Sequence, residues 1–330
     1  MPLTSLADSL AAMEIESTPP APDVPLRTQW RYIQSAQPVT LSEGGTPLLP
    51  MKAGLLLKDE GRNPNGSLQD RVASILLTAA RSAGCMHLAL PQNSLPADPL
   101  SDALAVAIAV YAAHAGVRST VTLSDAANET DFLRVTAAGA LCSRAGEPPA
   151  VILTAEERLK AAQLALRALA CELAEQMQWK LPETVLLPGA TPAEILEFES
   201  SFAWLRAQGW VRSLHAPRCI AVHIAPAVNG QDSGAAGAAA QALQKMSETM
   251  AIVEEEAVRA SLAHWARQGW MLSPGAAAAL AFYEQHMPVP GMTVLVNPRS
   301  ALASTTELAR LLRIRRYPGR MPVGGIITPQ

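Results

Sequence analysis

The sequence predicts an α/β protein with a two-lobed, three-layer arrangement of parallel sheets and helices. From Gly54 onward, short apolar segments alternate with long Ala-rich helical patterns. Such alternation is typical of parallel strands joined by crossover helices on both faces of a sheet. The chain has 330 residues, enough for roughly two domains of about 150 residues each. We therefore expect a ligand site in a cleft between two lobes, at the carboxyl ends of the strands.

Three strand and helix pairs form the first part of this alternation. The apolar segments are GLLLK (54–58), CMHLAL (85–90) and STVTL (119–123), and the helical patterns that follow them cover residues 67–83, 102–115 and about 130–138. Short apolar runs bounded by turn residues fit buried strands. This part alone predicts a parallel sheet.

The second part continues the same pattern after a long helix predicted over residues 155–177. The elements predicted next are strand TVLLP (184–188), helix 192–207, strand CIAVHI (219–224), helices 254–268 and 275–285, strand MTVLV (292–296) and helix 305–312. A Gly/Ala/Ser-rich segment at 229–240 predicts a loop.

The first 28 residues differ in composition from the rest of the chain. Residues 14–25 contain four prolines and three acidic residues. Such a segment has little apolar surface with which to offset the entropy cost of ordering. We expect residues 1–28 to form a mobile or loosely docked arm.

Charge and cysteine content argue against several functional classes. The 26 Lys and Arg residues nearly balance the 29 Asp and Glu residues, so the net charge is -3 and no nucleic-acid or membrane-surface partner is expected. The four cysteines form no C-x-x-C pair, which argues against a zinc site and a disulfide framework. No signal segment or run of 18 apolar residues is present, so we expect a cytoplasmic protein.

Several segments along the chain resemble one enzyme family. They are WRY (30–32), LSEGGTPLLP (41–50), LLLKDEGRNPNGSLQDR (55–71), YAAHAG (111–116), ACELAEQMQWKLPETVLLPG (170–189), FAWLRAQGWV (202–211) and VEEEAVRASLAHWARQGWMLSPGAAAALA (253–281). The sequence is similar to threonine synthase within the fold type II, or tryptophan synthase beta-like, pyridoxal-phosphate (PLP) enzymes. This resemblance implies a larger lobe from residues 29–84 and 151–330 and a smaller inserted lobe from 85–150.

The resemblance fails at the residue that carries the family's chemistry. In the family, the lysine of S-F-K-D-R forms a Schiff base with PLP, and here the matching residue is Gln69 in SLQDR. A carboxamide cannot condense with an aldehyde, because its nitrogen lone pair is delocalised into the carbonyl. Lys58 is the nearest amine in sequence, but it matches the lysine of the family's K-D-E segment on the preceding strand.

Two glycine-rich parts of the family's cofactor site are also altered. Where family members have S-G-N-x-G, this chain keeps Asn93 and Ser94 but no glycine, and prolines surround them. The phosphate loop would follow strand 184–188 and should be glycine-rich, so that consecutive N–H groups can hold the dianion. Here Gly189 and Thr191 remain, while a proline and three glutamates follow at positions 192, 194, 197 and 199. We expect poor phosphate binding.

The last departure lies after strand 292–296, where the family reads V-x-L-T-G-x-G. This chain reads VLVNPRSAL, which keeps Ser300 as a candidate hydroxyl but places Arg299 and Ala301 beside it. The remnant cofactor positions are therefore Asn93, Ser94, Gly189, Thr191 and Ser300. Candidates for lining the cleft are Lys58, Gln69, Asp70 and Arg71. No metal ligands are expected.

These observations leave three functional hypotheses open. The first is a catalytically inactive threonine synthase-like homologue, retained as a homodimer or with a protein partner for binding, assembly or regulation, with no cofactor expected. The second is a lyase-type enzyme that binds PLP or another small anion non-covalently, and the third is a small-molecule sensor. A basic cleft around Lys58, Arg71 and Arg299 would favour the second or the third hypothesis. A filled cleft together with an exposed apolar patch would favour the first hypothesis. The residues matching the family around Gln69 can also be purely structural, as caps and ion pairs.

Overall fold

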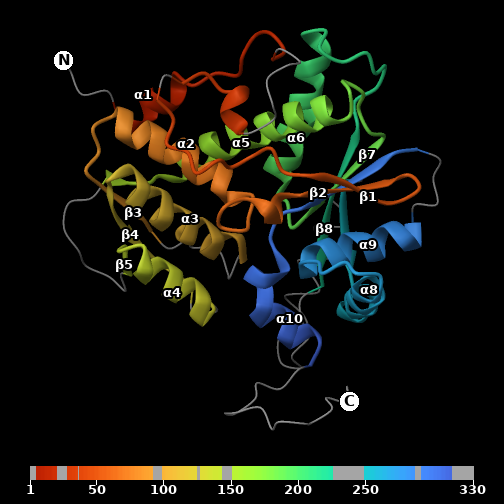
Figure 1. Cartoon of the computed structure of the whole chain (residues 1–330). Helices are drawn as coiled ribbons and strands as arrows, with labels where there is room; N and C mark the ends of the chain where they lie inside the picture. Colours follow the sequence, from red (N-terminus) through yellow and green to blue (C-terminus); the bar gives the residue numbers. More distant parts are fainter. Residues whose placement is uncertain are drawn as a thin grey trace.

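The computed structural model describes residues 5–20, 28–35, 37–91, 99–124, 127–142, 151–225, 249–286 and 291–313. These residues form two parallel-sheet lobes, one large and one small, with helices packed around them (Figure 1). This is the mixed α/β architecture that the alternation of apolar and helical segments predicts.

The larger sheet has six strands in the order β1-β2-β10-β7-β8-β9. Their bounds are Leu48–Lys52 (β1), Leu55–Asp59 (β2), Thr184–Pro188 (β7), Arg218–Ile224 (β8), Met250–Val253 (β9) and Thr293–Asn297 (β10). All neighbouring strands are parallel except β1, which pairs antiparallel with β2 at the edge of the sheet. Strands β1 and β9 were not predicted from the sequence, because both are short and only partly buried.

The smaller sheet has four parallel strands in the order β5-β4-β3-β6. They are His87–Leu90 (β3), Arg118–Val121 (β4), Leu141–Cys142 (β5) and Val151–Ile152 (β6). Helices α3 (Pro99–Ala115) and α4 (Glu129–Ala137) pack against this sheet. The small sheet therefore extends two residues beyond the boundary at 150 that the sequence suggested.

Helices cover both faces of the larger sheet. Val185 and Leu187 of β7 pack in one core with Phe198 of α6 (Pro192–Ala207), whereas Leu186 packs in a second core that includes α8 (Glu255–Arg267) and α9 (Pro274–His286). Because side chains alternate across a strand, these two cores lie on opposite faces. Figure 1 shows α5 (Ala155–Gln176) and α6 on one side of this sheet and α8 and α9 on the other, which confirms the three layers.

The N-terminal segment is more ordered than its composition suggests. Helix α1 (Leu6–Ala11) begins with a capping box between Ser5 and Asp8, and Leu6, Leu10 and Met13 are buried in the core against α2 (Gln69–Ser82) and α5. The expectation of a mobile or loosely docked arm is wrong for these residues. The physical reason is the helical spacing of the apolar side chains, which provides one buried face despite the nearby prolines.

The remaining described elements are short. They are the 3-10 helices Gln29–Arg31 (η1), Glu60–Arg62 (η2) and Ala301–Ser304 (η3), followed by α10 (Thr305–Leu311). Among the described residues, no helix is long and apolar enough to cross a membrane. The predicted loop at 229–240 lies outside the described residues.

Candidate functional site

Gln69 is the first residue of α2 and lies at the carboxyl edge of the larger sheet. The loop before it is joined to the segment after β10 by two backbone hydrogen bonds: the Leu68 N–H donates to Pro298 O and the Ser300 N–H donates to Gly66 O, both at 2.8 Å. The Gln69 side chain is half-buried and makes no hydrogen bond to any residue that the structure describes. The structure thus places Gln69 beside the end of β10.

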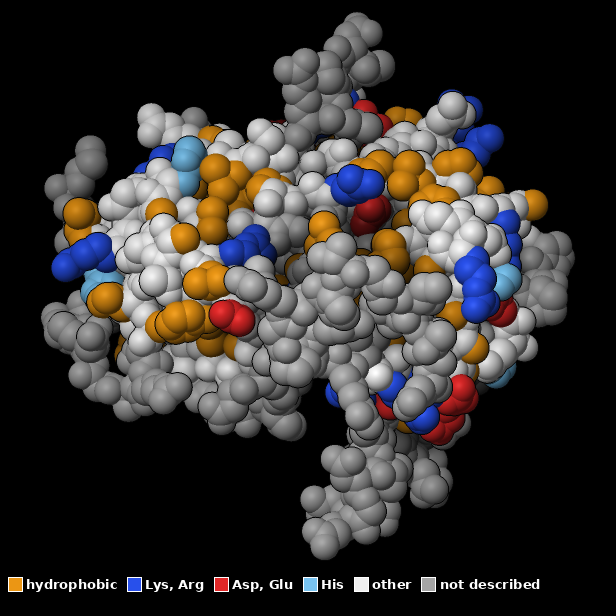
Figure 2. Space-filling view, turned by 60° about the horizontal axis from the view of Figure 1, so that its bottom comes forward, with side chains coloured by type: hydrophobic (Ala, Val, Ile, Leu, Met, Phe, Trp, Pro, Cys, Tyr) orange, Lys and Arg blue, Asp and Glu red, His pale blue; other side chains and the backbone are white. Residues whose placement is uncertain are grey.

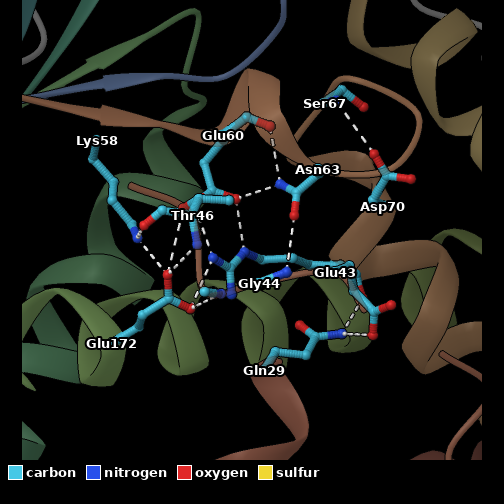
Figure 3. A network of polar contacts seen from close by, with 12 residues as sticks. Gln29, Glu43, Gly44, Thr46, Lys58, Glu60, Asn63, Ser67, Asp70 and Glu172 are labelled. Atoms are coloured by element: carbon cyan, nitrogen blue, oxygen red, sulfur yellow. Dashed lines mark hydrogen bonds and ion pairs between the residues drawn. The ribbon is translucent and has the colours of Figure 1, made fainter. Parts of the chain in front are cut away.

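Two cations and two carboxylates form a fully buried cluster next to this loop (Figure 3). Lys58 of β2 is ion-paired with Glu172 of α5 and also donates to Thr46 O at 2.7 Å. Arg71 of α2 binds both carboxylate oxygens of Glu60, at 2.7 and 2.8 Å, and reaches Glu172 at 3.0 Å. The cluster therefore joins β2, the loop after it, α2 and α5.

Electrostatics keep the two carboxylates of this cluster charged despite their burial. Burial alone would raise the pKa of Glu172, but the positive charges of Arg71 and Lys58 outweigh this effect and lower it to about 2. The same two cations lower the pKa of Glu60 against the opposing effect of burial. Because removing one member would leave an uncompensated buried charge, the four side chains act as a structural unit.

The turn before β1 supplies further donors to the cluster. Backbone N–H groups of Gly45 and Thr46 donate to the two oxygens of Glu172, each at 3.0 Å. The Thr46 hydroxyl donates to Glu60 at 2.6 Å, and the Asn63 amide donates to the same carboxylate at 2.7 Å. The residues of 41–71 that match the family pattern therefore hold the turn before β1 and the loop after β2 in place.

Glu43 has a separate set of neutral donors. Its carboxylate accepts hydrogen bonds from the Trp30 indole at 2.7 Å, the Ser74 hydroxyl at 2.5 Å and the Tyr111 hydroxyl at 3.0 Å. Burial and the nearby negative charge of Glu43 raise the pKa of Tyr111. Glu43 therefore ties the turn to α2 and α3, and both of its oxygens are engaged within the protein.

Asp70 organises the loop that leads into α2. Its carboxylate accepts from the Asn65 backbone N–H at 3.1 Å, from the Asn65 side-chain amide at 2.6 Å and from the Ser67 N–H at 3.2 Å. Burial raises the pKa of Asp70 to about 6, against the opposing effect of these hydrogen bonds.

The structure does not support Lys58, Asp70 and Arg71 as residues that line an open cleft. All three are fully buried, because each lies under the loop and satisfies its charge or its acceptors within the protein. A basic cleft around Lys58, Arg71 and Arg299 is also absent among the described residues, since each of these cations is paired with a carboxylate. Of the four cleft candidates, only Gln69 is partly exposed.

The N-terminus of α6, where the family's phosphate loop would lie, binds its own side chains. Thr191 is the N-cap; its N–H and hydroxyl donate to Glu194 at 2.8 and 2.9 Å, and the Glu194 N–H donates back to the Thr191 hydroxyl at 3.3 Å. Pro192 occupies the first helical position and has no N–H. Two of the free N–H donors at this helix end are thus occupied, and a third is missing because of the proline. The Glu194 carboxylate lies where the family's phosphate would bind.

The carboxyl end of β10 carries a polar chain that the sequence analysis missed. Asn297 donates from its side-chain amide to Asp59 at 2.8 Å and accepts from the Ser273 hydroxyl at 2.7 Å. The signal in the sequence was a polar residue directly after the buried TVLV run. Ser300, the predicted hydroxyl, instead caps η3, where it accepts from the Leu302 N–H at 3.3 Å. Asn93 and Ser94 lie outside the described residues.

The fold places the protein in a known structural class. The chain has the fold of fold type II PLP enzymes: it aligns with the crystal structure of O-ureido-L-serine synthase with a TM-score of 0.58 and 14% identity, over 87% of this chain and 98% of the other. It aligns with the crystal structure of a threonine deaminase from T.th. with a TM-score of 0.53 and 17% identity, over 77% and 92% of the two chains.

Sequence comparison finds similar proteins for part of the chain. Residues 39–191 match the model of the family described as pyridoxal-phosphate dependent enzyme. Threonine synthase of Methanosarcina acetivorans is 26% identical over 211 residues, which cover 56% of this chain and 50% of that protein. Residues 39–191 thus resemble the PLP-dependent enzymes, and the chain is similar to threonine synthase, although it spans about half the length of this relative.

Proposed function

We propose that this chain is a threonine synthase-like protein that no longer performs PLP catalysis and has been retained for binding, assembly or regulation. The observation that carries the proposal concerns the two positions at which the family has a lysine, the lysine of S-F-K-D-R and the lysine of K-D-E. Gln69 stands where the Schiff-base lysine is expected. Lys58 is enclosed in the buried ion pair with Glu172 and has no exposed surface.

The other parts of a PLP site support the same proposal. A bound PLP needs donors around its phosphate dianion, and the α6 N-terminus already satisfies its donors through Thr191 and Glu194. The family pattern also implies a hydroxyl near the pyridine nitrogen, and Ser300, the candidate for it, caps η3 instead. The residues present therefore do not fit the cofactor.

A protein partner is the binding role that the surface favours. Several large apolar side chains of the smaller lobe are exposed: Met86, Phe132, Leu133, Leu141, Val151 and Ile152. On the face shown in Figure 2, hydrophobic side chains lie among dispersed basic and acidic ones, so the described charges on that face do not gather into one basic patch. Exposed apolar side chains that lie together in one patch are typical of a contact surface.

The second candidate is a small-molecule sensor that binds a ligand without a covalent bond. The partly exposed Gln69 amide favours it, because this amide has two donors and an acceptor without partners among the described residues. A ligand contact at Gln69 would need no amine and no phosphate cradle.

The proposal is tested on the purified chain. It is incubated with PLP, reduced with borohydride and mapped by peptide mass spectrometry, with M. acetivorans threonine synthase treated in parallel as a positive control. We expect a pyridoxyl-lysine in the control and none in this chain. A stoichiometrically labelled lysine, at Lys58 or elsewhere, would overturn the loss of PLP catalysis.

The binding role is tested separately. Native complexes are cross-linked and captured with the wild-type chain and with a Phe132→Ser/Leu133→Ser variant, whose substitutions lie on exposed positions of α4. A specific partner or second copy captured by the wild type and lost in the variant supports a contact surface on the smaller lobe. Equal capture by both would contradict it. Calorimetry with a panel of amino acids, comparing the wild type with Gln69→Ala, distinguishes the sensor hypothesis.

A further inference from the structure

Helix α4 of the smaller lobe contacts the larger lobe through two charged side chains. Arg299, which follows β10, is ion-paired with Asp131 of α4, with distances of 3.1 and 3.4 Å to the two carboxylate oxygens. Both side chains are largely buried, with 10% and 3% of their surface exposed. A pair with so little exposure is screened by salt much less than a surface pair.

A second contact lies one turn further along the same helix. Arg134 donates to both the backbone oxygen and the side-chain oxygen of Asn65, at 3.0 and 2.9 Å. Asn65 belongs to the loop before α2, and its position is fixed by the hydrogen bonds to Asp70. The contact therefore ends on a rigid part of the larger lobe.

The geometry of α4 makes these two contacts act together. Asp131 and Arg134 are three residues apart, so they lie on the same face of the helix. Phe132 and Leu133 are exposed on the rest of its surface. The helix start is fixed by Asn128, whose side chain accepts from the Asp131 N–H at 2.8 Å and donates to the Asp131 carboxylate at 2.8 Å.

The larger-lobe side of the contact is equally well fixed. Arg299 lies in the segment that pairs with the loop before Gln69, through the antiparallel bridge between Ser67 and Arg299. The two partners of α4, Asn65 and Arg299, therefore come from the loops that follow two strands of the larger sheet, and these loops are already hydrogen-bonded to each other.

We propose that Asp131, Arg134, Asn65 and Arg299 form an interlobe clamp that holds the two lobes in one closed arrangement through the chain's own side chains. The clamp crosses the junction directly beside Gln69. In a protein that must admit and release a substrate there, the lobes would have to separate, and the clamp opposes this. The clamp restricts the relative motion of the lobes whether or not the chain binds PLP.

The clamp is tested by measuring the distance between the lobes in solution. Cys142 on β5 is the exposed cysteine, and the other three cysteines of the chain are buried. A second label is introduced at the exposed Ala266→Cys on α8 of the larger lobe. Spin labels at the two sites then report the distribution of interlobe distances by pulsed electron paramagnetic resonance.

We expect one narrow distance distribution for the otherwise wild-type chain and a broader or longer one for Arg299→Met and Arg134→Met. The matched control is Arg310→Met, because Arg310 forms an ion pair with Glu255 inside the larger lobe. Asp131→Asn keeps the volume of the side chain and serves if Arg299→Met does not fold. Hydrogen exchange in residues 65–69 should be at least tenfold faster in the clamp variants.

Three results would overturn the clamp. One is a broad distribution in the wild type, and another is clamp variants whose distributions coincide with that of the wild type. The third is a distance distribution that broadens as much in the Arg310→Met control as in the clamp variants. The broadening would then reflect a general loosening of the fold.

Discussion

Restoring the missing amine by Gln69→Lys should not by itself restore a PLP enzyme. Gln69 is half-buried at the start of α2 beside the end of β10, so a lysine there has room to reach a ligand at the junction of the lobes. A working site must also hold the phosphate, and PLP binding depends strongly on donors around that dianion. The N-terminus of α6 decides the outcome.

The magnitude follows from the donors that this helix lacks. The N–H groups of Thr191 and Glu194 are occupied by the capping box, and Pro192 has none. Each lost charge-assisted hydrogen bond costs roughly 1.5 to 3 kcal/mol, so losing two to three costs about 3 to 9 kcal/mol. PLP binding is then weaker by about two to six orders of magnitude. The carboxylate of Glu194 adds repulsion.

The assay is a PLP titration followed by borohydride reduction and peptide mapping. We expect no stable Schiff base for Gln69→Lys at micromolar PLP and no turnover of O-phosphohomoserine or threonine. A matched variant adds Thr191→Gly, Pro192→Gly and Glu194→Ala to Gln69→Lys, which frees the helix N-terminus. This combination should bind PLP at least a hundredfold more tightly than Gln69→Lys alone. A yellow, active enzyme from Gln69→Lys alone would refute the reasoning about the phosphate site.

Three further predictions concern the buried cluster and the turn above it. Glu172→Gln leaves Lys58 and Arg71 with too little negative charge in a buried site, so the free energy of unfolding in urea should fall by about 3 to 5 kcal/mol. Because the pKa of Glu172 is lowered from 4.5 to about 2, its contribution of about 3 kcal/mol is present above pH ~4.5 and lost as pH falls toward 2, and urea titrations at several pH values should show this. Gly44→Ala should lower the melting temperature, since Gly44 has φ +87° and an added Cβ would lie 2.5 Å from the backbone N of Gln29.

Each of these predictions has a control in the same chain. Glu256→Gln removes an exposed carboxylate whose side chain is 79% accessible, so it should change the unfolding free energy by less than about 1 kcal/mol. Gly116 also has a positive φ, of +70°, but an added Cβ would meet nothing within 4 Å. Gly116→Ala should therefore cost only the roughly 1 to 2 kcal/mol of left-handed strain, less than Gly44→Ala. The loss of unfolding free energy at acid pH should be absent in Glu172→Gln. If this variant had the same pH profile as the wild type, other groups would be the cause of the loss.

The fold could be predicted from the sequence because it depends on local and repeated features. Apolar runs such as TVLLP and TVLVN become β7 and β10, with every residue buried, and the Ala-rich segments between strands become covering helices. The short strands β5 and β6 were missed, since two exposed residues carry no periodicity. The order of α1 was also predicted wrongly. The composition of residues 1–28 does not show that the apolar side chains of α1 lie on one face, which becomes buried when the helix packs.

The chemistry of position 69 was likewise determined by the sequence, since a carboxamide lacks the reactivity of an amine in any fold. The tertiary structure alone decided the state of its neighbours. Lys58 and Arg71 are separated from Glu172 by about a hundred residues or more, and no local pattern indicates that these charges meet in a buried cluster. Arg299 and Asp131 meet across the lobes in the same way. Long-range pairing depends on how the chain folds back on itself, so a sequence can name the residues available for a site, whereas only the folded chain determines which of them remain free to bind a ligand.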